Sequence, residues 1–124
     1  MRLDFHGASV RAARDRLRRE LDARCPAARL EDARLVVSEL VANSLRYARP
    51  LADHTITVGW HVRPDALRLS VTDGGSTTHA PTERHPGGLA TGGRGLNIVH
   101  TLAQSWGVES VDEGTTVWAE LLLT

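Results

Sequence analysis

The feature that most constrains the fold is a pair of alternating segments joined by a very short connection. Residues 54–62, "HTITVGWHV", place apolar side chains at every second position, and residues 66–73, "ALRLSVTD", do the same. A period of two is typical of β-strands with one buried face. The three residues between them, "RPD" at 63–65, form a turn. Because so short a connection joins antiparallel neighbours, this region predicts a hairpin and not a βαβ crossover.

The rest of the chain divides into segments with helical or strand-like spacing. Helical spacing runs through residues 8–25, 30–48 and 94–106, and strand-like alternation runs through residues 2–6, 106–111 and 116–123. Ser9 is placed to cap the first helix, Pro26 to close it, and Pro50 to stop the second. The order β-α-α-β-β-loop-α-β-β predicts an α+β two-layer sandwich, with helices on one face of a mixed, mainly antiparallel sheet. A chain of 124 residues is one domain's length, so we expect a single domain over 1–124.

Composition excludes several functions. All 15 basic residues are arginine, so the lysine of a Walker A loop and the lysine of a Schiff base are both missing. The formal net charge is zero, so we expect no general attraction to nucleic acid or membrane. Cys25 is the only cysteine, which fits a reducing compartment. With no apolar run of about 20 residues, these features predict a cytoplasmic protein.

The second helical segment carries an acid and an amide one turn apart. Glu39 and Asn43 lie within "SELVANSLRYA", residues 38–48. The expected core face of this helix consists of Val37, Leu40, Val41 and Ser44. Residues four apart are neighbours on a helix, so we expect the acid and the amide to share a different face. An amide oxygen is a neutral ligand for Mg²⁺, and a nearby carboxylate can act as a general base. The alternative is a solvated stripe.

Asp73 ends the second strand of the hairpin on its inward side, in line with the apolar positions of that strand. A carboxylate there is costly unless it is paired. Gly74 and Gly75 follow, so the backbone can turn tightly or a ligand can approach closely. An ordinary Asp-Gly turn is the alternative. However, residues 74–93 continue as a long segment rich in Gly, Thr, Pro and His, and loops of this length are often functional lids.

A glycine cluster, "GGRGLNIV" at residues 92–99, leads directly into the third helix. The start of a helix presents free N–H groups and the positive end of the helix dipole, where an anion can bind. Arg94 can add a charged contact to a phosphate. The cluster lacks the third glycine of G-x-G-x-x-G and follows a loop, so we do not expect Rossmann-type binding.

The order of these features is more specific than any one of them. Together they describe a nucleotide site in which Asn43 holds a metal, Asp73 pairs with a donor on the base, and glycine amides cradle phosphates. The sequence here resembles the GHKL (Bergerat-fold) ATPase superfamily over nearly the whole chain. It is most similar to the small bacterial anti-sigma factor serine kinases and their actinobacterial relatives.

The resemblance rests on four segments. "LVVSELVANSLRYA" resembles the N box, "VTDGG" the first glycine box, "GGRGLNIVHTLAQSWGV" the second, and "GTTVWAEL" the closing strand. It implies that Glu39 is the catalytic base, Asn43 the Mg²⁺ ligand and Asp73 the acceptor for the adenine amino group. The remaining nucleotide-binding positions that it implies are Gly75, Gly93, Arg94, Gly95, Leu96 and Thr116. Thr116 would support the adenine end.

By this resemblance the chain is a Mg-ATP-dependent kinase that phosphorylates a serine of a STAS-type antagonist protein. It would also bind a sigma factor, and homodimers are typical of such proteins. The alternative is an ATP-gated binding module without phosphotransfer, since Thr77 replaces the last glycine of the wider superfamily's Asp-x-Gly-x-Gly box. An interaction domain that no longer binds nucleotide is the third hypothesis, which Asp73 and the later glycines disfavour.

Overall fold

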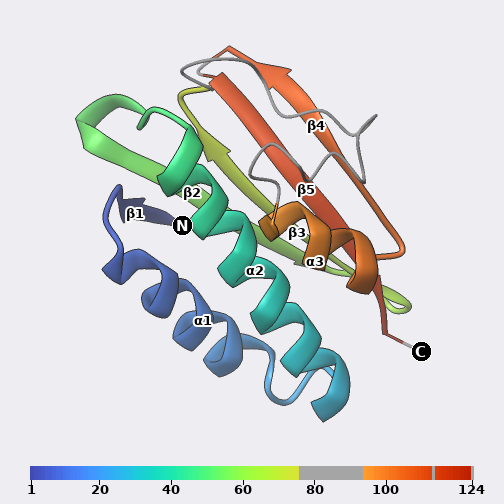
Figure 1. Ribbon diagram of the computed structural model, residues 1–124. Coiled ribbons are helices and arrows are strands. Elements are labelled where there is room, and N and C mark those ends of the chain that lie inside the picture. Colours follow the sequence, from blue (N-terminus) through green and yellow to red (C-terminus); the bar gives the residue numbers. More distant parts are fainter. Residues whose placement is uncertain (76–93, 113, 124) are drawn as a thin grey trace.

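The computed structural model describes residues 1–75, 94–112 and 114–123. Its elements follow the predicted order (Figure 1). The helices are α1 (Ala8–Leu21), α2 (Ala27–Tyr47) and α3 (Arg94–Leu102), and a short 3-10 turn, η1, spans Ala52–His54. The strands are β1 (Arg2–Asp4), β2 (Thr55–Val62), β3 (Ala66–Asp73), β4 (Ser105–Val111) and β5 (Gly114–Leu122). None of the described helices is long and apolar enough to cross a membrane.

The five strands form one sheet in the order β1-β2-β3-β5-β4. The predicted hairpin is β2–β3, in which Val62 pairs with Leu67 and Val58 with Val71. All four pairings among the described strands are antiparallel, so the α+β class is confirmed and the sheet holds no parallel pair in this part of the chain. Strand β5 lies between β3 and β4 and pairs along the whole of β3, so that Thr115 near its start lies opposite Asp73.

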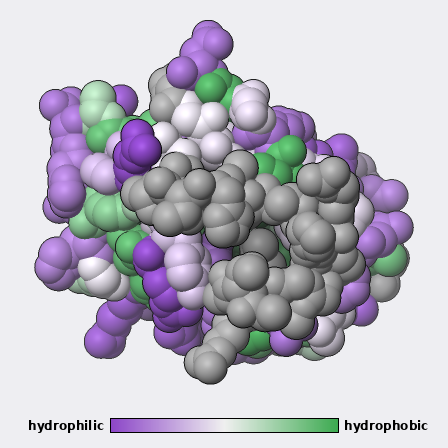
Figure 2. Space-filling model, turned by 45° about the horizontal axis from the view of Figure 1, so that its top comes forward, coloured by the Kyte–Doolittle hydropathy of each residue, from purple (hydrophilic) through white to green (hydrophobic). Residues whose placement is uncertain are grey.

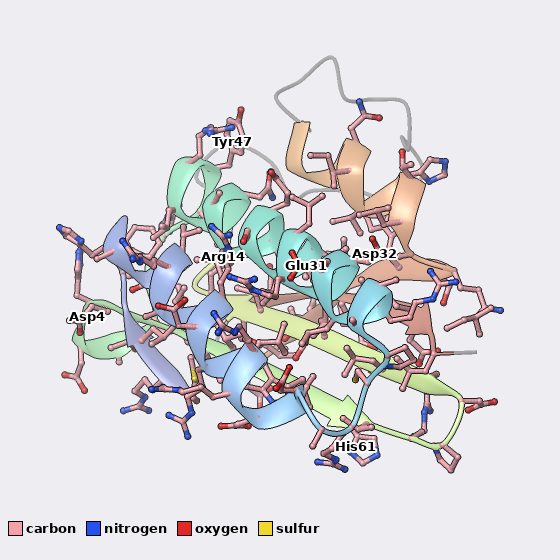
Figure 3. All side chains as sticks on the ribbon, turned by 90° about the horizontal axis from the view of Figure 1, so that it is seen from below. Asp4, Arg14, Glu31, Asp32, Tyr47 and His61 are labelled. Atoms are coloured by element: carbon pink, nitrogen blue, oxygen red, sulfur yellow. The ribbon has the colours of Figure 1, made fainter. Side chains whose placement is uncertain are left out.

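The helices cover one face of the sheet, and the core lies between the two layers (Figure 1). Strand alternation sets the sheet side of this core, as predicted. The buried strand residues are Ile56, Val58, Leu67, Leu69, Val71, Val117, Ala119 and Leu121. The helices contribute Ala13, Leu17, Leu21, Leu30, Ala33, Val36, Val37, Leu40, Val41 and Val99. Figure 3 views the molecule from below, with Tyr47 at the C-terminal end of α2.

The opposite face of the sheet carries polar and amphipathic side chains. The Arg68 guanidinium lies over the Trp118 ring, 4.1 Å from its centroid, and Arg68 also hydrogen-bonds Glu120 at 3.3 Å. Trp118 lies on the side opposite Val117 and Ala119, as expected from parity, but it is half-buried and not fully exposed. On the surface shown in Figure 2, hydrophobic side chains outside the grey region form small groups among hydrophilic ones.

Helix ends differ from the sequence predictions in three places. α1 ends at Leu21 and not at Cys25, because the following residues turn, with both Arg24 and Cys25 donating to the Leu21 carbonyl. Pro26 lies at the N-cap of α2, so this helix begins three residues earlier than predicted. α3 ends at Leu102, since residues 105–111 pair with β5 as strand β4.

The predicted cap at Ser9 is wrong. The helix begins at Ala8, so Ser9 lies in its first turn, where its hydroxyl donates to the Asp4 carbonyl. The Ala8 N–H donates instead to His6 Nδ1 at 3.1 Å. Ser9 therefore ties the start of α1 to β1, and its side chain is buried.

Candidate functional site

Asp73 is the last residue of β3, and it is only 4% exposed. Its Oδ2 accepts a hydrogen bond from the Ser44 hydroxyl on α2 at 2.6 Å. Its Oδ1 accepts one from the Gly75 N–H at 2.8 Å. The prediction that Asp73 faces inward and is paired is therefore confirmed, and its partners are a hydroxyl and a backbone amide.

The protonation of Asp73 is set by opposing effects. Burial raises the pKa of Asp73 above its ordinary value, because the ionised form loses contact with water. The hydrogen bonds from Ser44 and Gly75 lower it and offset part of that rise. An ionised carboxylate is an acceptor with about four lone-pair positions. Two are taken by protein donors, so the group keeps capacity to accept from a ligand.

The backbone around Asp73 is held by close contacts that require glycine. A Cβ at Gly74 would lie 2.3 Å from the Pro50 carbonyl oxygen, a distance that real Cβ atoms do not reach. Gly75 has φ of +98°, where a side chain is strained. Backbone bonds also join this turn to the segment after α2, with the Gly74 N–H donating to Arg49 O at 2.7 Å. At Gly74 the close approach that glycine permits is therefore made by the protein's own backbone.

Asp73, its two donors Ser44 and Gly75, and the neighbouring Thr115 form the Asp73 cluster. Glu39 and Asn43 lie on α2, the helix that carries Ser44. Asn43 directly precedes Ser44 and is 9% exposed, so it belongs to the buried side of the helix and not to a separate solvated face. Glu39, one turn earlier, is half-buried. The helix therefore brings the predicted metal ligand next to the residue that holds Asp73, with the predicted base one turn away.

Thr116 does not lie with Asp73. It pairs with Thr72 across the β3–β5 ladder, and the two hydroxyl oxygens are 2.6 Å apart on the opposite side of the sheet. The direct partner of Asp73 in the ladder is Thr115, which is buried. The Thr115 Oγ1 lies 3.7 Å from the position of a Cβ at Gly75. The threonine beside the carboxylate is thus Thr115, which corrects the assignment of Thr116.

The described part of the second glycine box begins at Arg94, the first residue of α3. Arg94, Gly95 and Leu96 form the first turn of this helix, as predicted, and α3 packs against α2. Gly93 and Thr77 lie outside the described residues. The described part of this box therefore supplies a helix start, with backbone N–H groups that have no partner within the helix.

The side chains near Asn43 limit which metal ion could bind there. Among the described residues there is no group of three or more His, Cys, Asp and Glu side chains arranged to hold one. An ion at Asn43 would take an amide oxygen from α2. Mg²⁺ suits such a site, because it keeps several waters and is often bound through substrate phosphates.

Two residues of the cluster were not predicted as site residues. Ser44 lies on the core face of α2, as its spacing predicts. A polar hydroxyl at a core position is the feature that could have marked it as a site residue. Thr115 has the same parity as Val117 and Ala119, so the alternation of β5 already placed it inward.

Comparisons with known proteins agree with this architecture. A sequence profile of the histidine kinase-like ATPase domain matches residues 5–121. The chain is 30% identical over 99 residues to the serine-protein kinase RsbW of Listeria innocua serovar 6a. The match covers 71% of this chain and 62% of that protein, so the chain spans about three fifths of the relative's length. The resemblance to the GHKL superfamily is confirmed: the chain belongs to the histidine kinase-like ATPase domain family.

Proposed function

We propose that this chain binds Mg-ATP beside Asp73 and transfers a phosphoryl group to a serine of a partner protein. The observation that carries the proposal is the buried Asp73 carboxyl group, held by two uncharged donors. Burying a carboxylate costs free energy, and neither donor brings a compensating charge. A ligand donor that uses the remaining acceptor positions explains why the group is kept there.

Adenine recognition would use the inward ends of β3 and β5. The exocyclic amino group of adenine donates hydrogen bonds, and Asp73 can accept one. Thr115 lies on the same side of the sheet as Asp73, and its hydroxyl can hold a bridging water or a ring nitrogen. These two residues would therefore orient the base.

The phosphates would lie toward α2 and α3. The first turn of α3 offers backbone N–H groups and the positive end of a helix dipole. The Asn43 amide oxygen would hold Mg²⁺, which when bound neutralises phosphate charge. Glu39 would accept the proton of the attacking serine hydroxyl. Asn43 and Glu39 lie one turn apart on α2, so one rigid helix sets their spacing.

The partner class follows from the family resemblance. The similar protein from Listeria innocua is named a serine-protein kinase, which supports a protein serine as the acceptor. By the wider resemblance, the serine would lie on a STAS-type antagonist, and the same chain would sequester a sigma factor in the cytoplasm as a homodimer. Thr77 favours the second candidate, an ATP-gated binding module without phosphotransfer.

The nucleotide site is tested by thermal unfolding of the wild type and of Asp73→Asn, each with and without Mg-ATP. Ligand at about 100 times its Kd stabilises a protein by roughly 2.7 kcal/mol, which raises Tm by several degrees. We expect this rise in the wild type and a much smaller one in the variant, because an asparagine offers one acceptor oxygen where Ser44 and the Gly75 N–H already donate to two. Equal rises, or none in the wild type, would overturn the proposal.

Phosphotransfer needs a second variant. Glu39→Gln should keep the ATP-dependent rise in Tm and lose phosphate transfer to the partner serine. Transfer at the wild-type rate would remove Glu39 from its role. If the wild type shows the rise in Tm but never phosphorylates a partner that it captures with ATP, the binding module is the correct function.

A further inference from the structure

Ser44 makes the one side-chain hydrogen bond to Asp73 within the described part of the chain. The oxygen–oxygen distance is 2.6 Å, which is typical of a hydroxyl bound to an ionised carboxylate. Ser44 is 2% exposed, so water does not compete for this bond. The bond joins α2, in the helical layer, to the end of β3 in the sheet.

We propose that Ser44 is a positioning residue that orients Asp73 to accept from the amino group of adenine and to reject a purine with a carbonyl there. This inference rests on the proposed ATP site. It goes further, because it assigns base selectivity to a residue outside the matched nucleotide-binding positions.

The selectivity follows from the direction of the hydrogen bond. A serine hydroxyl has one proton, and Ser44 gives it to Asp73 Oδ2. The Ser44 oxygen and the Asp73 carboxylate then offer lone pairs alone. Adenine brings an amino donor to such a site, whereas hypoxanthine, the base of ITP, brings a carbonyl acceptor. Two acceptors that face each other in a buried site cost free energy.

Removing the hydroxyl would weaken this arrangement in two ways. Asp73 would keep one fixed oxygen, Oδ1 on the Gly75 N–H, and its carboxyl plane could rotate about the side chain. Loss of a donor also favours the protonated acid, which can donate to a carbonyl. Both effects reduce the preference for an amino group.

The test compares Mg-ATP and Mg-ITP binding to the wild type and to Ser44→Ala by titration calorimetry. ITP carries a carbonyl in place of the amino group at the purine 6-position, and the neighbouring N1 then carries a proton. We expect the wild type to prefer ATP, and we expect the ratio of the two affinities to fall by about tenfold in Ser44→Ala, in line with one lost hydrogen bond to a charged group. A thermal scan of each protein without nucleotide checks that it is folded.

Ser9→Ala is the matched control. Ser9 is also buried, and its hydroxyl also bonds an oxygen acceptor, the Asp4 carbonyl, at the start of α1. This variant loses a buried hydroxyl without touching Asp73, so its ATP-to-ITP ratio should stay within about twofold of the wild type. If Ser44→Ala does not fold, Ser44→Cys, of similar size and with a weaker donor, should show a reduced ratio.

The outcomes separate the two proposals. A wild type that binds ATP, with the same ATP-to-ITP ratio in the Ser44 variant, overturns the role of Ser44 and leaves the ATP site intact. An equal fall in the Ser9→Ala control also overturns it, because the effect would then be one of general stability. A wild type that binds neither nucleotide overturns the ATP site and the role of Ser44 together.

Discussion

Gly114 is the position where one added methyl group should do the most damage to the candidate site. It begins β5, and a Cβ there would lie 2.1 Å from the Asp73 carbonyl oxygen and 2.7 Å from Gly74 backbone atoms. Real Cβ atoms do not come within 3.0 Å of such atoms. Gly114→Ala must therefore move the backbone of β3 and β5 apart by about 0.9 Å, and the neighbouring atoms are backbone, which cannot move by a change of rotamer.

The effect of Gly114→Ala can be measured as a loss of stability and as a loss of affinity for Mg-ATP. Forcing extra atoms into a packed region typically destabilises a protein by about 1–3 kcal/mol. For a domain of this size that corresponds to a fall in Tm of roughly 4–12 °C. Since the shift acts on Asp73 itself, affinity for Mg-ATP should also fall by more than about tenfold, as expected when a binding group is displaced by nearly 1 Å.

Gly7→Ala is the control for this experiment. Gly7 has helical backbone angles, φ −55° and ψ −33°, and a Cβ there meets nothing within 4 Å. Its Tm should stay the same or rise, because alanine reduces the freedom of the unfolded chain. Thermal unfolding and an ATP titration on both variants decide the matter. If Gly114→Ala melts within about 2 °C of the wild type and keeps its ATP affinity, the steric reasoning is refuted.

Two further predictions concern ionisable groups away from the site. Burial alone would raise the pKa of Glu120, but hydrogen bonds from Arg63 and Arg68 outweigh it, so the pKa lies below the ordinary value. Glu120 therefore contributes stability above its unfolded pKa that is lost as pH falls through the lower folded pKa. Glu120→Gln should be less stable than the wild type by up to about 1 kcal/mol at pH 7. Denaturant unfolding should show that this difference in stability vanishes well below pH 4.5. A difference in stability that does not change with pH would contradict the ion-pair account. Burial raises the pKa of the Cys25 thiol, which lowers the fraction of reactive thiolate. An aromatic disulfide reagent should therefore label the native protein at least about tenfold more slowly than the urea-unfolded protein. Equal labelling rates would show that Cys25 is accessible in the native protein.

Local periodicity predicted much of the fold because it depends on neighbouring residues alone. Alternation along β3 placed Asp73 inward, and helical spacing placed Ser44 on the core face of α2, both correctly. The bond between them joins positions 29 residues apart, and it depends on how α2 lies across the sheet, which spacing does not specify. The sequence pattern therefore could not predict that Ser44 is the hydrogen-bond donor to Asp73.

The error at Thr116 has a different origin. The segment that resembles the family's closing strand, "GTTVWAEL", holds two threonines side by side, and the motif alone does not say which of them faces the core. Parity with Val117 selects Thr115 as the inward residue, and the structure agrees. Helix ends are less predictable from sequence, since a proline such as Pro26 can stop one helix or cap the next, and here it caps α2.

The position of β5 has a consequence for how the protein is made. The cluster draws on α2, the end of β3 and the start of β5, and β5, though last in sequence, pairs between β3 and β4. On the ribosome, a chain halted before residue 114 leaves Asp73 at an unpaired strand end, without Thr115 beside it. Nucleotide capture should therefore begin only after β5 has left the exit tunnel and inserted into the sheet. In a cell, the proposed ligand would then stabilise only those chains in which β5 is already paired with β3.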